Sequence, residues 1–466
     1  MNVISKDAIS ATVDELRERL DGDYVTPEDT HWDDARVAWN LAVDQRPAAV
    51  AIPESVEDIV EVVRYARANG YRVAGQSTGH NAGPLAEGLD HTVLVKTHKM
   101  RGVKIDPAAG VARVESGALW MDVTYPAGEY GLAPLAGSSP DVGVAGYSLG
   151  GGISWLGRKH GLATNSVIAI ELVNANGDQI RASSVENPDL FWAMRGCGGS
   201  FGIVTAIEMR LYPVRELYAG WLIFPMERAE EVLNAWRDWV DTVPDEVTSV
   251  GRLLQIPPLP DVPEPLRGRR LVVVEAAMLM GADDASRLLR PLRKLGPEMD
   301  TFATMPATEL QTLHMDPPHP VPGMGDHMLL RDLTPAGIEN TVQVAGAGST
   351  SPLLSVEFRH LGGKLGRSEP GNGATGSIDA RFAMFAVGMT MDPVMTAAVS
   401  AYLPVVKEAL ARYDSGREYL NFAEHRTDVR RLWPMDTYHR LRQVKREHDP
   451  LDVFRSNHPV PPAERN

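Results

Sequence analysis

The stretch Tyr71-Arg-Val-Ala-Gly-Gln-Ser-Thr-Gly-His80 predicts the fold of the first part of this chain. Its apolar start indicates a short strand that runs directly into a glycine-rich loop. An apolar strand at 46–53 and an amphipathic helix at 54–69, which an Asn-Gly pair ends, precede it. Strand, helix, strand and glycine loop in this order are typical of an α/β unit that presents backbone amides to a ligand.

Two further glycine-rich stretches follow, at 137–152 and 195–202. None of the three contains the Gly-Lys-Ser/Thr of a nucleotide phosphate loop, and none fits G-x-G-x-x-G at the start of a helix. Ordinary turns would explain each stretch alone. Three of them within about 130 residues, each expected beside a strand, favour a large anionic cofactor that lies across several loops. His80, at the end of the first loop, is then a candidate for a bond to that cofactor.

Composition limits the class of protein. The 466 residues include 46 Lys+Arg and 61 Asp+Glu, a formal net charge of −15, and 44% are hydrophobic. This length predicts two or three globular domains, and the acidic balance makes nucleic acid or an anionic membrane surface an unexpected partner. A single cysteine, Cys197, excludes an intramolecular disulfide and a multi-cysteine metal or iron–sulfur site.

The sequence predicts no targeting segment and no membrane segment. Residues 1–20, of which 7–20 read as a helix, lack the apolar core of a signal peptide. The most apolar later stretch, 271–281, is short and contains Glu275, whereas a membrane helix needs roughly 20 apolar residues. We therefore expect a cytoplasmic protein with no membrane partner. The excess of Arg over Lys and the abundance of Ala suggest a bacterial source.

Several motifs together resemble a known family. They are Gly75–His80, Val142-Gly-Val-Ala-Gly-Tyr-Ser-Leu-Gly-Gly-Gly152, Asp189-Leu-Phe-Trp-Ala-Met-Arg-Gly-Cys-Gly-Gly-Ser-Phe-Gly-Ile-Val204 and the C-terminal Tyr419-Leu-Asn-Phe422 and Phe454-Arg-Ser-Asn457. The chain is similar to the vanillyl-alcohol oxidase superfamily, whose FAD-binding domain is of the PCMH type. Within it, the pattern resembles the berberine-bridge-enzyme-like branch. The resemblance covers nearly the whole chain, and it is loosest at about 213–415.

The resemblance implies an α+β fold with FAD as cofactor. Residues 1–212 would form a two-subdomain, PCMH-type FAD-binding domain. Residues 213–415, where expected helices at 229–243 and 285–295 alternate with expected strands at 271–279 and 353–361, would form a substrate domain with an antiparallel sheet and flanking helices. Residues 416–466 would return to the FAD domain.

The resemblance also implies how FAD is held. His80 would bond to the 8α carbon of the flavin. Many members add a second bond from a cysteine, but the matching residue here is Ser139, so the sequence resembles singly linked members of the 6-hydroxy-D-nicotine oxidase type. Val142, beside the flavin C4a carbon, would leave room for oxygen. The implied cofactor-binding residues are Gly75, Gln76, Ser77, Thr78, Gly79, His80, Asn81, Ser138, Ser139, Val142, Gly143, Gly146, Gly152, Ile203, Val204, Asn421 and Asn457.

Hydride transfer to a flavin from a carbinol or amine carbon needs a base for the O–H or N–H proton. Alternation along the expected strand 353–361 puts Ser355, Glu357 and Arg359 on one face, which turns either to solvent or to a pocket. Glu357 would be a base with a raised pKa or simply a partner of Arg359. Tyr419 is the other candidate base, although a buried phenol needs a cationic neighbour that the sequence does not identify.

One local cluster contains metal-ligand types, namely His314, Asp316 and His319. Interleaved prolines and the lack of a fourth ligand favour a plain loop, so we expect no metal.

These observations predict an oxidase with FAD attached through His80 only. It would act on a carbon bearing oxygen or nitrogen in a small-molecule metabolite, and O2 would reoxidise the flavin to give H2O2. One alternative is a flavin-dependent oxygenase or oxidative cyclase of natural-product biosynthesis on the same scaffold. Another is a flavin-binding protein without turnover of its own. Substrate identity and oligomeric state are left open.

Overall fold

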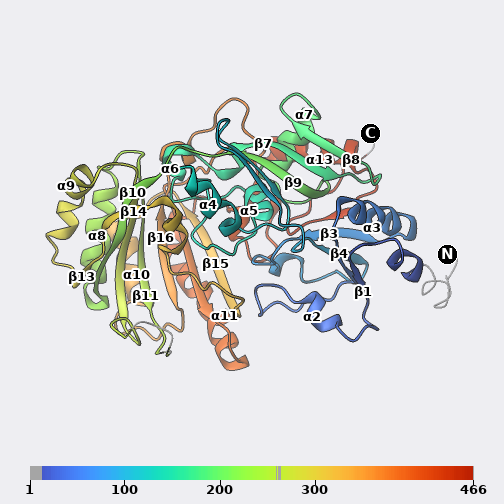
Figure 1. Cartoon of the computed structure of the whole chain (residues 1–466). Helices are drawn as coiled ribbons and strands as arrows, with labels where there is room; N and C mark the ends of the chain where they lie inside the picture. Colours follow the sequence, from blue (N-terminus) through green and yellow to red (C-terminus); the bar gives the residue numbers. More distant parts are fainter. Residues whose placement is uncertain (1–12, 259, 261–263, 465–466) are drawn as a thin grey trace.

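Three β-sheets organise the chain in this computed structural model, which describes residues 13–258, 260 and 264–464. Two five-stranded sheets lie in one half of the molecule, and an eight-stranded sheet forms the other half (Figure 1). The predicted α+β fold, with an antiparallel sheet in residues 213–415, is confirmed. The half formed by residues 1–212 and 416–466, which the resemblance assigns to FAD, is here called the FAD-binding half.

The first sheet has the strand order β1-β2-β4-β3-β18. Strands β2, β4, β3 and β18 run parallel, and β1 pairs antiparallel at the edge. The strands are β1 (Asp23–Val25), β2 (Ala49–Ile52), β3 (Arg72–Gln76), β4 (Thr92–Lys96) and β18 (Phe454–Arg455). The C-terminal β18 beside β3 places the last segment of the chain against the first glycine loop.

Helix α3 (Val56–Asn69) connects β2 to β3, as the sequence predicts. Ser55 accepts a hydrogen bond from the backbone of Asp58, and Gly70 ends the helix in the left-handed conformation at φ 76°. The Asp58 carboxylate is 2% exposed and also accepts hydrogen bonds from the backbone of Asp21 (2.8 Å) and Gly22 (3.0 Å). The same side chain therefore caps α3 and anchors the preceding loop.

The second sheet is antiparallel, in the order β5-β6-β9-β7-β8. A hairpin joins β7 and β8 through Gly177, at φ 79°. The strands are β5 (Val103–Asp106), β6 (Val111–Glu115), β7 (Val167–Val173), β8 (Gln179–Ser183) and β9 (Ile203–Arg210).

The third sheet is antiparallel, in the order β13-β10-β12-β11-β16-β17-β15, with β14 also paired to β10. Both predicted domain boundaries, at 212–213 and 415–416, fall outside its strands. The strands are β10 (Glu216–Pro225), β11 (Val247–Gln255), β12 (Arg270–Met278), β13 (Met299–Asp300), β14 (Ala303–Pro306), β15 (Gly323–Leu330), β16 (Ser355–His360) and β17 (Phe382–Met389).

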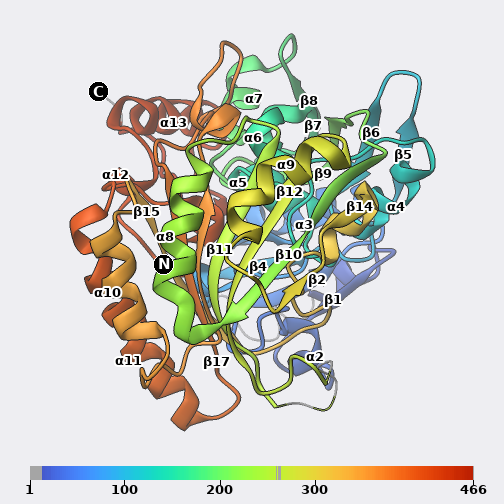
Figure 2. The same cartoon turned by 90° about the vertical axis from the view of Figure 1, so that its left-hand side faces the viewer.

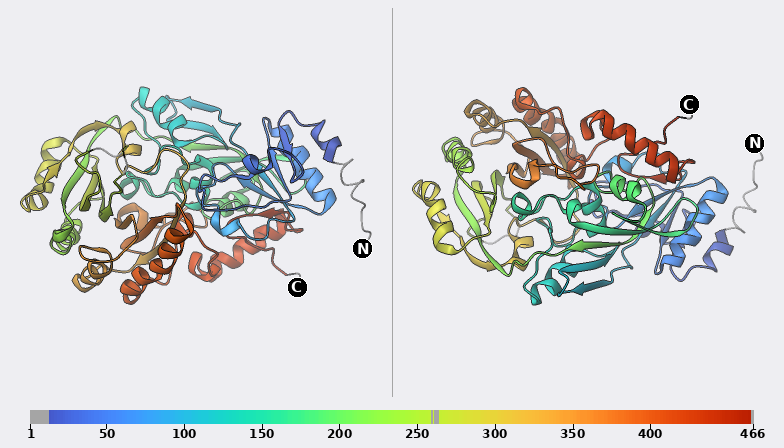
Figure 3. Two further views of the ribbon diagram at one scale, coloured as in Figure 1. Left: turned by 90° about the horizontal axis from the view of Figure 1, so that it is seen from below. Right: turned by 90° about the horizontal axis from the view of Figure 1, so that it is seen from above.

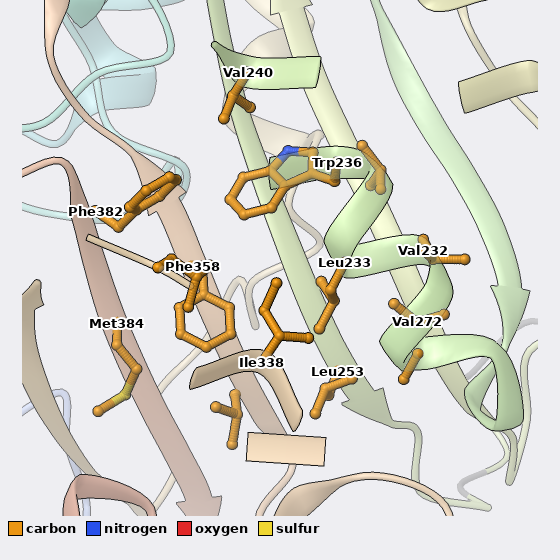
Figure 4. Packing of buried hydrophobic residues seen from close by; sticks show 14 of the residues in the cluster. Val232, Leu233, Trp236, Val240, Leu253, Val272, Ile338, Phe358, Phe382 and Met384 are labelled. Carbon is orange, nitrogen blue, oxygen red and sulfur yellow. The ribbon is translucent and has the colours of Figure 1, made fainter. Parts of the chain in front are cut away.

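Four helices cover the outer face of this third sheet (Figure 2). They are α8 (Ala229–Val240), α9 (Ala282–Arg293), α10 (Pro335–Ala345) and α11 (Pro393–Leu410). Phe358 and Met384 from the sheet meet Leu233, Trp236 and Ile338 from the helices in a buried core (Figure 4). Burial of this apolar surface holds the sheet to its helices.

The inner face of the third sheet turns toward the FAD-binding half. Ser355 and Glu357 on β16 are 6% and 2% exposed. The predicted alternation is therefore correct, and the solvent alternative for this face is wrong. Charged side chains on a buried face need partners. Those partners have to lie in the region between the two halves of the molecule.

The remaining helices lie mainly in the FAD-binding half. In Figure 3 the red C-terminal segment lies beside the blue N-terminal strands, and the yellow part of the substrate domain lies at the other end of the molecule. These helices are α2 (Trp32–Arg36), α4 (Trp120–Glu129), α5 (Val144–Gly150), α6 (Gly157–His160), α7 (Pro188–Met194), α12 (Val429–Leu432) and α13 (Met435–His448).

Three expectations need correction. The second glycine stretch contains a helix, α5, because Gly143 serves as its N-cap and glycines follow its end. The first 20 residues form a shorter helix than expected within the described part, at 13–17, and residues 7–12 lie outside it. The region 393–413, rather than 271–281, is long and apolar enough by composition to cross a membrane, and α11 within it packs against α10, β15 and β17.

Candidate cofactor and active site

Segments from three parts of the sequence meet at one point of the FAD-binding half. Asn457 Nδ2 donates a hydrogen bond to the backbone carbonyl of Asn81. Asn81 Nδ2 lies 3.4 Å from the carbonyl oxygen of Leu420, and Asn421 Nδ2 lies 3.0 Å from that of Tyr147. The structure therefore brings together the predicted residues Asn81, Asn421 and Asn457. Asn81 and Asn421 are 340 residues apart in the sequence.

The first glycine loop follows β3 and is packed against residues 38–40. Gly79 has φ 87°, and a Cβ there would lie 2.9 Å from Ala38 Cβ, so a larger residue does not fit. The Trp39 backbone amide donates to the Thr78 carbonyl at 2.9 Å. This packing fixes the end of the loop, where His80 lies.

His80 is enclosed on three sides. The Trp39 ring stacks on the imidazole with 3.9 Å between centroids and 17° between planes. Thr78 Oγ1 lies 2.8 Å from Nδ1, and Asp141 Oδ1 lies 3.5 Å from Nε2. Sequence patterns single out neither Trp39 nor Asp141: Trp39 lies outside the glycine-rich stretches, and Asp141 lies inside the second stretch as one polar residue among several.

The second and third glycine stretches join the first. A Cβ on Gly143 would lie 2.5 Å from Ser77 Oγ, so α5 approaches the first loop at its N-terminus. The backbone amides of Gly196 and Gly198 donate to the Leu149 carbonyl at the other end of α5, at 2.9 and 3.0 Å. All three stretches therefore border one region, although only the first and third directly adjoin a strand.

Unpartnered polar atoms line this region. Among the described residues, buried atoms without a hydrogen-bond partner include Gln76 Nε2, Ser77 Oγ, His80 Nε2, Asn81 Oδ1 and the Tyr147 hydroxyl. A buried polar atom left without a partner costs about 1–3 kcal/mol.

The glycines of the same region leave room for a ligand. A Cβ on Gly146 or Gly199 would meet nothing within 4 Å. Polar atoms that lack partners and glycines that face open space fit a long polar cofactor such as FAD.

The other predicted cofactor residues do not all lie in the same surroundings. Ile203 Cδ1 lies 3.4 Å from a Cβ built on Gly75, so it borders the loop, but Ile203 and Val204 are 2% and 6% exposed and also belong to the core. Gly152, at φ 83°, packs against Tyr147 and Ala163, which indicates a structural role. Ser138 donates to Asp316 at 2.7 Å and so links the cofactor region to the substrate domain.

A buried charged cluster lies on the inner face of the third sheet. His314 Nδ1 lies 2.6 Å from Glu275 Oε2, and its Nε2 lies 2.8 Å from Glu357 Oε2. Arg252 Nη2 lies 2.7 Å from Glu275 Oε1, and Arg359 Nε donates to Glu357 at 2.6 Å. Glu275 is fully buried, and Arg252, His314 and Glu357 are at most 4% exposed.

The contacts within the cluster determine the protonation states of its members. Burial by itself raises the pKa of Glu357, but Arg359, His314 and Arg252 together hold it well below its usual range. Burial likewise lowers the pKa of His314, but Glu275 and Glu357 raise it to about 9. Glu357 is therefore a charged partner of Arg359 and His314, and the alternative of a base with a raised pKa has no support.

Tyr419 lies close to Arg359 but is deeply buried. Its hydroxyl oxygen accepts a hydrogen bond from the Gly152 amide at 2.6 Å, and the side chain is 2% exposed. Burial raises the pKa of the phenol, against the opposing effects of the Gly152 amide and the Arg359 cation. Arg359 is thus the cationic neighbour that the sequence did not identify.

Sequence patterns do not reveal the roles of three cluster members. Glu275 stands out only as a charge in an apolar stretch and His314 only as a metal-ligand type, and no pattern marks Arg252. A lone carboxylate in an otherwise apolar strand, as in 271–281, was the available signal. Within the described residues no group of three potential ligands surrounds a metal position. His314 faces carboxylates with both ring nitrogens, Asp316 binds Ser138, and His319 is exposed.

Glu424 is a second titratable group near the inner face. Its carboxylate accepts the Gly325 amide at 2.8 Å, and burial, aided by the charge of Asp326, raises its pKa to about 7. Because this folded-state value exceeds the unfolded one of 4.5, ionisation of Glu424 costs stability as the pH rises from about 4.5 to about 7. Above pH 7 the cost is present in full.

A Glu424→Gln variant is therefore expected to be more stable than the native chain at pH 8, by about 1–3 kcal/mol, and nearly equal to it at pH 4.5. Urea unfolding at the two pH values measures the difference. The exposed Glu408→Gln on α11 is the control and should show no pH-dependent difference. An equal effect of Glu424→Gln at both pH values would show that the gain does not come from ionisation.

Comparisons with known proteins agree with this geometry. An FAD binding domain model matches residues 47–183, and a berberine and berberine-like model matches residues 418–461. (R)-6-hydroxynicotine oxidase of Paenarthrobacter nicotinovorans is 28% identical over an alignment of 459 residues, and the alignment covers 95% of this chain and 97% of that protein.

Solved structures have the same fold. 6-Hydroxy-D-nicotine oxidase from Arthrobacter nicotinovorans gives a TM-score of 0.81 at 27% identity and covers 95% of this chain and 98% of its own. A variant of Physcomitrella patens BBE-like 1 gives a TM-score of 0.84 at 20% identity, over 97% and 100% of the two chains.

Proposed function

Because this chain is an FAD-linked oxidoreductase of the PCMH-type, berberine-bridge-enzyme-like family, we propose that it is an oxidase with FAD attached covalently through His80 alone. It removes a hydride from a carbon bearing oxygen or nitrogen in a small-molecule metabolite. Bound FAD supplies a two-electron acceptor that passes the electrons to O2 and yields H2O2. The observation that carries the proposal is the enclosure of His80 within a region of unpartnered polar atoms.

A single attachment follows from the side chains available. The Ser139 hydroxyl is a poor substitute for a thiol, and it already donates to Asp141 at 2.7 Å. Cys197 is 1% exposed in the core of the FAD-binding half, where burial raises the pKa of its thiol far above the usual range. A buried, protonated thiol is a weak nucleophile, so Cys197 does not supply a second bond.

The substrate domain supplies the charges over the proposed site. Glu357 holds the Arg359 guanidinium through Nε, and the cation lies 5.2 Å from the centroid of the Phe422 ring. We assign Glu357 as the residue that positions Arg359, and Arg359 as the cation beside Tyr419. Burial keeps the pKa of the Tyr419 phenol above its usual value despite this cation, so Tyr419 is protonated near neutral pH and is not assigned as the proton acceptor. Relatives named as 6-hydroxynicotine oxidases are consistent with an amine carbon as the site of oxidation.

Mass spectrometry of the intact protein after acid denaturation tests the attachment. The native chain should carry the added mass of one FAD, because the bond survives denaturation. His80→Ala should lose all of it, and Ser139→Ala should retain it. No added mass in the native chain would contradict covalent attachment, and added mass in His80→Ala would move the bond to another residue.

Reaction of the reduced flavin with oxygen tests the oxidase proposal without a known substrate. The holoenzyme is photoreduced without oxygen and mixed with O2 in a stopped-flow instrument. Rapid reoxidation with one H2O2 per flavin is expected. Slow reoxidation would indicate a dehydrogenase. Without substrate an oxygenase also releases H2O2, so that alternative is tested separately, by whether oxygen atoms from labelled O2 appear in the product.

A further inference from the structure

Asp141 is a buried carboxylate that the proposed oxidation does not use. It is 7% exposed and lies just before α5. Its Oδ2 accepts a hydrogen bond from Trp39 Nε1 at 2.5 Å, and its Oδ1 accepts one from Ser139 Oγ at 2.7 Å. Oδ1 also lies 3.5 Å from His80 Nε2. Three separate segments thus direct a polar group to this one carboxylate.

The partners of Asp141 also hold His80. Trp39 donates to Asp141 with its ring nitrogen and stacks on His80 with its ring face. The same residue binds the Thr78 carbonyl through its backbone amide at 2.9 Å. Neither the carboxylate nor the imidazole can therefore move without disturbing the other.

The two ring nitrogens of His80 face groups of different character. Nε2 faces the carboxylate, and Nδ1 faces the Thr78 hydroxyl at 2.8 Å. A carboxylate beside one imidazole nitrogen favours the proton on that nitrogen, which leaves the lone pair on the other. Burial raises the pKa of Asp141, but His80, Ser139 and Trp39 together lower it below its usual value, so the group stays charged.

We propose that Asp141 is the positioning residue for covalent flavin attachment, holding His80 with its proton on Nε2 so that Nδ1 attacks the 8α carbon. The inference rests on the proposed attachment at His80. In this step the 8α methyl group loses one proton and Nδ1 forms the new N–C bond, while two electrons pass to the flavin ring. Nε2 then releases its proton through Asp141 to solvent. Dioxygen takes the two electrons with two protons and leaves as H2O2.

Asp141 acts through its negative charge as well as through its contacts. Attack through Nδ1 places a positive charge on the imidazole while its Nε2 proton is still bound, and a buried carboxylate nearby stabilises that charge. An uncharged group of the same shape keeps the loop packing but lacks this effect. Asp141→Asn makes that replacement. Ser139→Ala instead removes one hydrogen bond to the carboxylate and keeps its charge.

The test compares covalent with total flavin in freshly purified Asp141→Asn, Ser139→Ala and native protein. Absorbance of the native protein gives total FAD, and mass spectrometry after acid denaturation gives the covalent fraction. Asp141→Asn should keep total FAD near the native level while its covalent fraction falls at least tenfold. Ser139→Ala, which keeps the charge of Asp141, should lose less of the covalent fraction than Asp141→Asn, and Asp141→Glu should recover part of the fraction that Asp141→Asn loses.

Several outcomes would overturn the inference. A native covalent fraction in Asp141→Asn would show that the charge is not needed. Loss of all FAD from Asp141→Asn would show that Asp141 holds the loop rather than the imidazole. Equal loss in Ser139→Ala would assign the effect to loop geometry. Absence of covalent FAD from the native chain itself would refute the attachment first and the role of Asp141 with it.

Discussion

His314→Leu is expected to lower the free energy of unfolding by about 3–5 kcal/mol at pH 7. The native imidazole lies between two carboxylates, at 2.6 Å from Glu275 and 2.8 Å from Glu357. Leucine removes the imidazole that contacts one oxygen of each carboxylate, and both carboxylates stay buried with Arg252 and Arg359 as counter-ions. Two buried, charged oxygens that lose their hydrogen-bond partner account for the large effect. Urea unfolding measures it.

The pH dependence identifies the charge as the cause. The pKa of His314 is raised from 6.5 to about 9 in the folded chain. Its contribution to stability is therefore complete below about pH 6.5 and is lost as the pH rises through about 9. The gap between native and His314→Leu should be largest near pH 6–7 and should narrow by pH 10.

A matched histidine lies on the same loop. His319 is exposed, so His319→Leu should change the unfolding free energy by no more than about 0.5 kcal/mol. If His314→Leu behaves like His319→Leu, or if its effect does not change between pH 7 and 10, the buried ion-pair interpretation is wrong.

The cluster shows what sequence patterns predict and what they leave out. Alternation along 353–361 correctly places Glu357 and Arg359 on one face, since side chains in a strand point to opposite sides in turn. It does not name their partners, because Arg252, Glu275 and His314 arrive through the pairing of β11, β12 and β16 and the loop after β14. Strand register is a tertiary property.

The cofactor region likewise has features that the sequence predicts and contacts that it does not. Local signals predict α3, β3 and the first glycine loop, because capping residues and glycines act within a few positions. The resemblance of the C-terminal motifs implies that Asn421 and Asn457 contact the cofactor, and the structure places both beside Asn81 at the end of the first glycine loop. The contact of Trp39 with His80 joins an unremarkable loop to that site, and no short-range pattern signals it.

The C-terminal segment, 416–466, contains the residue with the second large expected effect. Lys445→Met is expected to lower the free energy of unfolding by about 3–5 kcal/mol and to reduce bound FAD. Lys445 Nζ donates to Asp449 and to the Ser200 carbonyl, each at 2.6 Å, and both charged residues are fully buried. Ser200 belongs to the third glycine stretch, so this lysine connects α13 to the cofactor region.

Asp449 explains why methionine is poorly tolerated there. Its carboxylate also accepts the amides of Val453 at 2.8 Å and Phe454 at 2.9 Å, which start β18 beside the first glycine loop. Methionine fills the volume of the lysine stem but leaves a buried carboxylate without its cation. Gln443→Met, at an exposed position of the same helix, controls for the new side chain and should be close to native in stability and FAD content.

A double variant separates charge from packing. Lys445→Met combined with Asp449→Asn keeps a carbonyl acceptor for the backbone amides and removes the uncompensated charge. It should therefore recover at least about 1 kcal/mol of the stability that Lys445→Met loses, a coupling that urea unfolding of the four proteins of the cycle measures. Additive losses would mean that the two side chains stabilise the chain independently. The ion pair would then not be what ties α13 and β18 to the glycine loops around the flavin.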